Sequence, residues 1–209
     1  MIRVLIADDH AVVREGLRRI LLAAGDMTVA GEAATAQELL QLARQVACDV
    51  ALVDLSMPGS AGLEALRELR SLRPGLPIVV LSIHPESQYA VRVIQAGAYA
   101  YLGKSVEPTV ILHAIRKAYV GERYITEEVG QLLADHLVSA RDRAPHELLS
   151  DREFQVLEML AKGKTVTEIA AELSLSTKTV STYRARVLAK LGARTNADLT
   201  RYALTHGLG

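Results

Sequence analysis

Hydrophobic positions along the first 120 residues alternate between two patterns. Short apolar runs of strand length are separated by longer amphipathic stretches of helix length. The apolar runs are Arg3–Ala7, Met27–Gly31, Asp49–Val53, Ile78–Leu81 and Ala98–Leu102. The amphipathic stretches are Val12–Ala24, Ala36–Gln45, Gly62–Leu72, Ser87–Ala96 and Pro108–Tyr119. Because strands that alternate with helices pair in parallel, the pattern predicts an α/β domain with a doubly wound parallel (βα)5 sheet.

The pattern changes after residue 120. Residues 121–147 predict a linker with one helix, Thr126–Ser139, capped by Thr126 and followed by the charged segment Ala140–Pro145. From residue 148 to 209 no strand pattern remains, and Ser150 with Glu153 forms a capping box that predicts the start of a helix. Three further helices are predicted at Thr165–Leu173, Thr177–Leu191 and Thr195–Thr205. We therefore expect three parts, 1–120, 121–147 and 148–209, the last a small all-α domain of four helices.

Composition narrows the class of protein. Half of the residues are hydrophobic, so the chain can bury a core, and the formal net charge is zero. The C-terminal part nevertheless has a local excess of basic residues, which suits a nucleic-acid partner. Its basic residues are Lys162, Lys164, Lys178, Arg184, Arg186, Lys190, Arg194 and Arg201, against the acidic residues Glu168, Glu172 and Asp198.

Cys48 is the single cysteine, which excludes an internal disulfide, and its apolar neighbours predict a buried side chain. The first apolar run stops at Asp8 after seven residues, which is too short for a signal peptide. No segment approaches the roughly 20 apolar residues of a membrane span. We expect a cytoplasmic protein with no membrane partner.

Charged and hydroxyl side chains follow the predicted strands at the edge of the sheet where ligands bind. Asp8 and Asp9 follow the first run, Asp54 the third, Ser82 the fourth and Lys104 the fifth. Three carboxylates that converge without compensation would cost several kcal/mol, and a hard divalent cation relieves that repulsion. Mg²⁺ suits oxygen ligands and neutralises a phosphoryl group in transfer, while the lysine and serine supply donors to phosphoryl oxygens.

These residues, within Asp8-Asp9, Asp54-Leu-Ser-Met-Pro58, Ser82 and Gly97-Ala-Tyr-Ala-Tyr-Leu-Gly-Lys104, resemble the flavodoxin-like receiver domain of two-component response regulators over roughly Met1 to Tyr119. The resemblance implies that Asp54 accepts phosphate from a sensor histidine kinase. It implies that Asp9, Asp54 and the backbone carbonyl of Ser56 hold Mg²⁺ directly, and that Asp8 acts mainly through water. Ser82 and Lys104 would hold the phosphoryl group, and Tyr101 would reorient with Ser82.

Two features leave alternatives open in this domain. Many receivers carry a small residue after the switch hydroxyl, whereas Ile83 follows Ser82 here and His84 comes next, so slower dephosphorylation is a hypothesis. An aspartate-nucleophile phosphatase would use Asp54 and Mg²⁺ as well, but it would normally need a carboxylate where Ser56 stands. The resemblance to receivers implies instead that the chain is not an enzyme in the usual sense, because a receiver catalyses only its own phosphoryl transfer and autodephosphorylation. A DNA-binding module independent of phosphorylation is the other alternative.

The segment Thr165–Arg184 fits two helices joined by a tight turn at Ser174. Ile169 and Leu173 would face the core, Ala170 would allow a close helix crossing, and Val180 would fill the junction. A recognition helix contacts base edges with its N-terminal residues, and flanking cations contact phosphates. Ser176 or Thr177 would cap that helix. The candidate DNA contacts are Thr165, Thr177, Lys178, Thr179, Ser181, Thr182, Tyr183, Arg184 and Arg186.

The stretch from Leu149-Ser-Asp-Arg-Glu153 through Glu168-Ile-Ala170 and Lys178-Thr-Val180 to Lys190-Leu-Gly192 resembles the LuxR-type helix-turn-helix. With the receiver in front, the whole chain resembles the NarL/FixJ family of response regulators. The resemblance implies double-stranded DNA as a partner, a homodimer on DNA, and contact with RNA polymerase as an option. The last helix, with Leu199, Tyr202, Ala203 and Leu208, is either a dimer seam or packs within its own domain.

Overall fold

In the computed structural model, residues 1–57, 62–138, 144–173 and 175–208 are described. Pro58 of the receiver motif, Ser139 at the predicted end of a helix, residues 140–143 of the predicted charged segment and Ser174 of the predicted turn lie outside these residues. The chain divides into two compact units, Met1–His136 and Leu137–Gly209. The segment predicted as a linker is thus shared between both units, and most of its helix belongs to the first.

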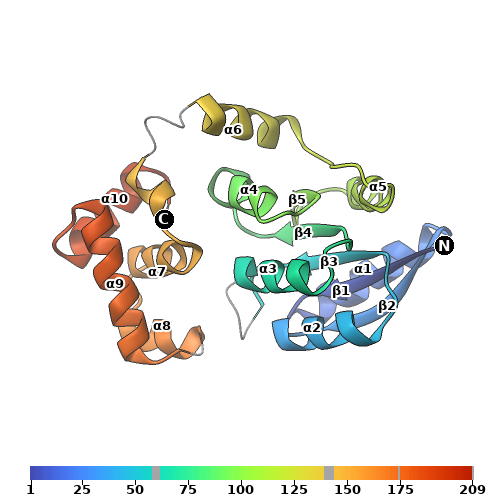
Figure 1. The fold of residues 1–209 in the computed structure, drawn as a ribbon, viewed down its shortest axis with the longest axis horizontal. Helices are drawn as coiled ribbons and strands as arrows, with labels where there is room; N and C mark the ends of the chain where they lie inside the picture. Colours follow the sequence, from blue (N-terminus) through green and yellow to red (C-terminus); the bar gives the residue numbers. More distant parts are fainter. Residues whose placement is uncertain (58–61, 139–143, 174, 209) are drawn as a thin grey trace. The chain divides into compact units, whose positions relative to one another are not determined.

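The first unit contains a five-stranded parallel sheet with the strand order β2-β1-β3-β4-β5 (Figure 1). Its strands are β1 (Ile2–Ala7), β2 (Met27–Ala33), β3 (Val50–Asp54), β4 (Ile78–Ser82) and β5 (Ala100–Gly103). Crossovers between parallel strands are right-handed, and the strand order runs from β1 to β2 in one direction and then through β3 to β5 in the other, so the helices cover both faces. The predicted (βα)5 fold is confirmed.

Five helices alternate with the strands along the chain, and a sixth, most of which belongs to this unit, follows the fifth. They are α1 (Ala11–Ala23), α2 (Ala36–Gln45), α3 (Gly62–Leu72), α4 (Glu86–Gln95), α5 (Pro108–Tyr119) and α6 (Glu127–Val138). Helices α1 and α5 pack on one face of the sheet, where Leu21 and Ile115 join a core with Val4 and Leu52. Alternate strand residues point to the other face, where α2, α3 and α4 lie (Figure 1).

The described residues of the second unit form helices joined by short turns and contain no strand. It consists of the 3₁₀ helix η2 (Pro145–Leu148) and of α7 (Asp151–Ala161), α8 (Val166–Glu172), α9 (Thr177–Leu191) and α10 (Asn196–Thr205). The predicted capping box is present, because Ser150 Oγ accepts from Glu153 N and Glu153 Oε2 accepts from Ser150 N. The predicted four-helix domain is confirmed, and η2 is an addition that the proline-ended linker pattern did not indicate.

Strand boundaries differ from the sequence prediction in a way that matters for the site. Asp54 and Ser82 are the last residues of β3 and β4, whereas the hydrophobic runs ended one residue earlier. Both polar side chains are therefore held by strand backbone rather than by a loop. Regular strand pairing fixes their directions, since Asp54 pairs with Leu81 and Ser82 with Gly103.

Candidate functional site

The candidate site lies at the carboxyl edge of the sheet. Asp8 follows β1, Asp54 ends β3, Ser82 ends β4 and Lys104 follows β5. The strand order places β1, β3, β4 and β5 side by side, so their ends converge. The side chains predicted from separate strand ends are thus neighbours in space.

Lys104 bridges two buried carboxylates. Its Nζ lies 2.8 Å from Asp54 Oδ2 and 2.6 Å from Asp8 Oδ2. Asp8 and Asp54 are each only 1% exposed. Because a buried carboxylate needs a charge partner, the Lys104 ammonium group offsets part of the cost of burying both side chains.

The pKa values at this site reflect burial and pairing. Burial raises the pKa of Asp54, and the hydrogen bonds from Lys104 and from the backbone of Ser56 offset that rise only in part. Burial alone would lower the pKa of Lys104, but its hydrogen bonds to Asp54 and Asp8 outweigh burial and raise it. Lys104 therefore remains an ammonium at neutral pH.

Three carboxylates and one imidazole form a cluster at this edge of the sheet, here called the acidic cluster. One ligand atom each from Asp8, Asp9, His10 and Asp54 lies within 4.8 Å of the others. His10 Nδ1 is 2.7 Å from Asp9 Oδ1, and the His10 backbone N donates to Asp8 Oδ1 at 2.8 Å. Sequence reasoning missed His10, although its place directly after the Asp-Asp pair at a strand end was a usable signal.

Hydrogen bonds join Ser82 to the loop that follows it. The backbone N of His84 donates to Ser82 Oγ at 3.1 Å, and Tyr101 Oη donates to the His84 carbonyl at 2.8 Å. Ser82 and Tyr101 are buried. Ser56 lies across the site, with its backbone N 3.1 Å from Asp54 Oδ1 and its Oγ 3.4 Å from His84 Nε2. Both predicted switch residues therefore contact one short loop.

Comparison with known proteins agrees with this geometry. Residues 4–116, more than half of the chain, match the family described as the response regulator receiver domain. The chain is a response regulator. Residues 147–203 of the regulator match the family described as bacterial regulatory proteins, luxR family.

Relatives and solved structures match both units together. The regulator is 41% identical over 209 residues to the response regulator UvrY of Escherichia coli strain K12, covering 100% of this chain and 96% of that protein. It is 38% identical to the response regulator GacA of Pseudomonas aeruginosa, covering 100% of this chain and 98% of GacA. Among solved structures, Salmonella enterica serovar Typhimurium RcsB bound to the promoter P1flhDC in the presence of phosphomimetic BeF3⁻ matches with 28% identity and a TM-score of 0.70, over 96% of this chain and 97% of that chain.

The second unit of the regulator has the helix-turn-helix packing that the sequence predicted. Ile169, Ala170, Leu173 and Val180 are all buried. The Leu175 backbone N donates to the Ala170 carbonyl at 2.8 Å, which ties the start of the segment before α9 to α8. The described residues thus place α9 as the candidate recognition helix of a LuxR-type DNA-binding domain.

Some of the predicted DNA-contact side chains are exposed, and others form hydrogen bonds within the second unit. Val180 and Val187 are buried, so the opposite side of α9 faces outward, and it carries Lys178, Ser181 and Arg186. In the described part of the chain neither Lys178 nor Arg186 has an ion-pair partner. Thr177 and Thr182 are exposed as well, whereas Tyr183 is half-buried.

Four of the predicted DNA contacts have side-chain hydrogen bonds within the second unit, and one of them is Thr182, whose Oγ1 donates to the Lys178 carbonyl at 3.0 Å. Thr165 caps α8, with its Oγ1 2.8 Å from Glu168 Oε2. Ser176 caps α9, and its Oγ lies 2.7 Å from Thr179 Oγ1. Arg184 Nε donates to Asn196 Oδ1 at 2.6 Å. Their roles in DNA binding remain predictions.

Some basic residues of the second unit form ion pairs within that unit. Lys190 Nζ lies 2.6 Å from Glu153 Oε2, and the Glu153 side chain is 3% exposed. Burial would raise the pKa of Glu153, but hydrogen bonds from Lys190 and Ser150 outweigh burial and lower it. Lys164 pairs with Glu172 and Arg201 with Asp198.

The last helix packs within its own unit. Leu199, Ala203 and Leu208 are buried in the single chain. Tyr202 Oη lies 3.0 Å from His146 Nδ1, and its ring stacks on His206. Of the two interpretations of these residues, intradomain packing is the one that the contacts favour.

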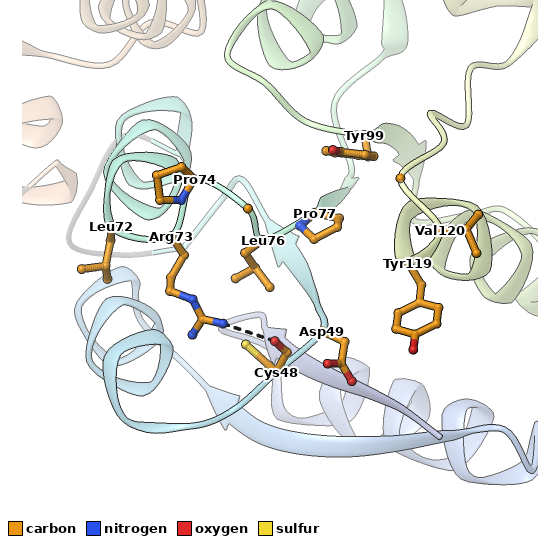
Figure 2. A pocket seen from close by; sticks show the side chains of 12 residues that line it. Cys48, Asp49, Leu72, Arg73, Pro74, Leu76, Pro77, Tyr99, Tyr119 and Val120 are labelled. Atoms are coloured by element: carbon orange, nitrogen blue, oxygen red, sulfur yellow. Dashed lines mark hydrogen bonds between the residues drawn. The ribbon is translucent and has the colours of Figure 1, made fainter.

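In the first unit, a cavity of about 600 Å³ lies beside the amino ends of β3 and β4, at the edge of the sheet opposite Asp54 (Figure 2). The side chains of Cys48, Arg73 and Tyr119 line it. Arg73 donates to the carbonyls of Ala43 and Cys48, so it joins the segment after α3 to helix α2 and to the loop before β3. Cys48 is buried, as predicted, and burial raises the pKa of its thiol.

Among the described residues, no helix has the length and apolar character needed to cross a membrane.

Proposed function

We propose that Asp54 accepts a phosphoryl group from the phosphohistidine of a sensor histidine kinase. An Asp54 carboxylate oxygen attacks phosphorus, an acyl phosphate forms, and the P–N bond to the imidazole breaks. The imidazole nitrogen takes the bonding electron pair and is protonated. The single observation that carries this proposal is the ion pair from Lys104 to Asp54 at 2.8 Å, at the converging strand ends.

Lys104 and Ser82 would hold the transferred group. The phosphoryl oxygens add negative charge beside Asp54, and the Lys104 ammonium lies within reach of that position. Ser82 Oγ is a hydroxyl donor at the end of the adjacent strand β4. Hydrolysis of the acyl phosphate by water would return Asp54 to its free form, which is the expected autodephosphorylation.

The acidic cluster fits a Mg²⁺ ion. Three carboxylates and one ammonium leave two negative charges without compensation, and a divalent cation balances them. Oxygen donors are the ligands that Mg²⁺ prefers, and they would come from Asp9, Asp54 and the Ser56 carbonyl, with Asp8 acting through water. When bound, the ion would neutralise charge that develops during phosphoryl transfer.

Phosphorylation would control DNA binding by the second unit, and a homodimer would place two α9 helices on two half-sites. RcsB bound to promoter DNA with a phosphomimetic supports this interpretation. We propose Lys178, Ser181, Thr182 and Arg186 as the first contacts, because their side chains are exposed on α9. A cytoplasmic location would agree with DNA as the proposed partner. Contact between the DNA-bound chain and RNA polymerase would then control transcription.

Labelling with radioactive acetyl phosphate tests the acceptor. The wild type and Asp26→Asn, a remote aspartate paired with Arg116, should both be labelled. Asp54→Asn should not be labelled. Equal labelling of Asp54→Asn and the wild type would exclude Asp54. Sequencing of genomic fragments retained by the phosphorylated and unphosphorylated chain would then identify the operators.

A further inference from the structure

A cavity of about 1040 Å³, here called the α6 cavity, lies within the first unit between helix α6 and the loops that follow β4 and β5. Gln131 and Leu132 of α6 line one side, and Ile83 and Val106 of the two loops line the other. The cavity in Figure 2 is a separate one, beside the amino ends of the strands. A volume of this size is sufficient for a small organic molecule.

Two side-chain contacts hold α6 beside α4 and so fix the wall of the α6 cavity. Thr126, the residue before α6, donates its hydroxyl to Glu86 Oε2 at 3.0 Å. Gln95 Nε2 of α4 lies 2.9 Å from His136 Nε2 near the end of α6. The contacts stand at opposite ends of the two helices, so the cavity is enclosed by elements of one unit.

Apolar side chains from three separate segments reach the α6 cavity. Ile83 is 71% exposed, and Val106 and Leu132 are half-buried. They come from the loop after β4, the loop after β5 and helix α6, so one apolar body can contact all three. Because such a body would remove this apolar surface from water, its binding is favourable.

The charged side chains that line the α6 cavity are unequally compensated. Lys104 is neutralised by the two buried carboxylates that it bridges, at 2.6 and 2.8 Å. In the described part of the first unit, by contrast, Glu86 and Glu128 form no ion pair. Burial raises the pKa of Glu86, the hydrogen bond from Thr126 lowers it, and the nearby charge of Glu128 raises it. The cavity therefore carries an excess of negative charge, which is complementary to a cation.

We propose that the α6 cavity binds a small organic cation with an apolar body, of the class of aromatic and alkyl amines. The apolar body contacts Ile83, Val106 and Leu132, and the ammonium group lies between the carboxylates of Glu86 and Glu128. An ammonium group donates charge-assisted hydrogen bonds to both carboxylates and relieves their repulsion. The inference goes beyond the proposed function, because the binding requires no phosphoryl group.

Calorimetric titration of the full chain with phenethylamine at low ionic strength tests the chemistry of the ligand, since salt screens exposed charges. Phenylacetate has the same ring with the opposite charge, and ethylamine has the same charge without the ring. Phenethylamine should bind severalfold more tightly than either. Affinity for phenylacetate equal to that for phenethylamine would overturn the cation. Equal affinity for ethylamine would overturn the apolar body, and no heat of binding with phenethylamine would overturn the site.

Replacement of the carboxylates by amides tests where the ammonium group lies. Glu86→Gln and Glu128→Gln should each weaken the binding of phenethylamine severalfold, and Glu86→Gln keeps an oxygen acceptor for the Thr126 hydroxyl. Glu122→Gln is the matched control, because Glu122 pairs with Lys117 and does not line the α6 cavity. Unchanged affinity in either cavity variant overturns the placement between the two carboxylates.

Hydrogen–deuterium exchange of the full chain with and without phenethylamine tests the location. Exchange should slow severalfold in residues 83–87, 103–106 and 128–132, which line the α6 cavity. Residues 72–77, which line the cavity in Figure 2, serve as the internal control and should not change. Slower exchange only at residues 72–77, or at none of these segments, overturns the proposal. Failure of the proposed function is measured separately, by the acetyl phosphate labelling of Asp54.

Discussion

Lys104 Nζ lies 2.8 Å from Asp54 Oδ2, although the two residues are fifty positions apart in the chain. Parallel pairing of β3, β4 and β5 brings them together, and Asp8 adds a second carboxylate to the same ammonium group. A single lysine thus compensates two buried charges, and the candidate site depends on it for both stability and chemistry.

Replacement of Lys104 by Met should therefore destabilise the first unit. We expect a loss of about 2–4 kcal/mol in the free energy of unfolding at neutral pH, because the substitution leaves buried carboxylates without a partner. Urea unfolding measures the loss. Lys104→Arg, which keeps the charge, should lose less. A Lys104→Met chain as stable as the wild type in metal-free buffer would contradict the role of this ion pair.

Mg²⁺ should stabilise the folded chain, since the proposed site needs the converged carboxylates of the native state, which the unfolded chain does not bring together. At a concentration of about 100 times its dissociation constant, a bound ion adds about 2.7 kcal/mol. Thermal unfolding with increasing Mg²⁺ measures the effect, and Asp9→Asn should reduce it. Asp26→Asn, at an exposed aspartate outside the cluster, is the control, and an equal reduction in both variants would argue against a specific site.

Ile83 lines the same cavity as Ser82 and Lys104, and its side chain is 71% exposed. We expect Ile83→Ala to speed labelling by small phosphodonors and autodephosphorylation severalfold, because a smaller side chain admits donors and water more readily. The decay of labelled protein measures the second rate. No change in either rate would remove Ile83 as a barrier.

Lys178 and Arg186 should contribute to DNA binding through phosphates. Replacing either one by Ala should weaken binding to all sequences similarly and reduce the salt dependence of log K by about one unit of slope. Fluorescence anisotropy at several salt concentrations gives the slope. Arg201→Ala is the control, because Arg201 already pairs with Asp198. An unchanged slope in Lys178→Ala would exclude a phosphate contact there.

The ion pair between Glu153 and Lys190 should make the second unit sensitive to acid. Glu153 has a lower pKa in the folded chain than its ordinary value of 4.5, so its contribution to stability is present above that value and is lost as the pH falls through the folded pKa. Lys190→Met should cost about 1–2 kcal/mol at neutral pH, since Lys190 is partly exposed. It should also weaken the pH dependence. Urea unfolding followed by circular dichroism at pH 7 and pH 4 tests both, and an unchanged pH dependence would contradict the prediction.

The position of the site could be predicted from the sequence because polar residues interrupt hydrophobic runs at strand ends. Asp54 and Ser82 stand out against such runs, and parallel strands bring their carboxyl ends to one edge. Sequence reasoning missed His10. Its position next to Asp9 is visible in the sequence, but the direction of its ring toward the Asp9 carboxylate is set by the backbone after β1. It also counted Lys190 in the basic excess, while the structure pairs this residue with the buried Glu153.

Local patterns determined the elements of this protein, because hydrophobic period, capping residues and strand length depend on neighbouring positions. The alternation of strands and helices and the capping box of Ser150 followed from the sequence alone. Tertiary structure decided which distant side chains share a partner: Lys104 with Asp8 and Asp54, and Thr126 with Glu86. Such contacts depend on how whole elements pack, and packing is set by the combined shape of the core rather than by any one segment.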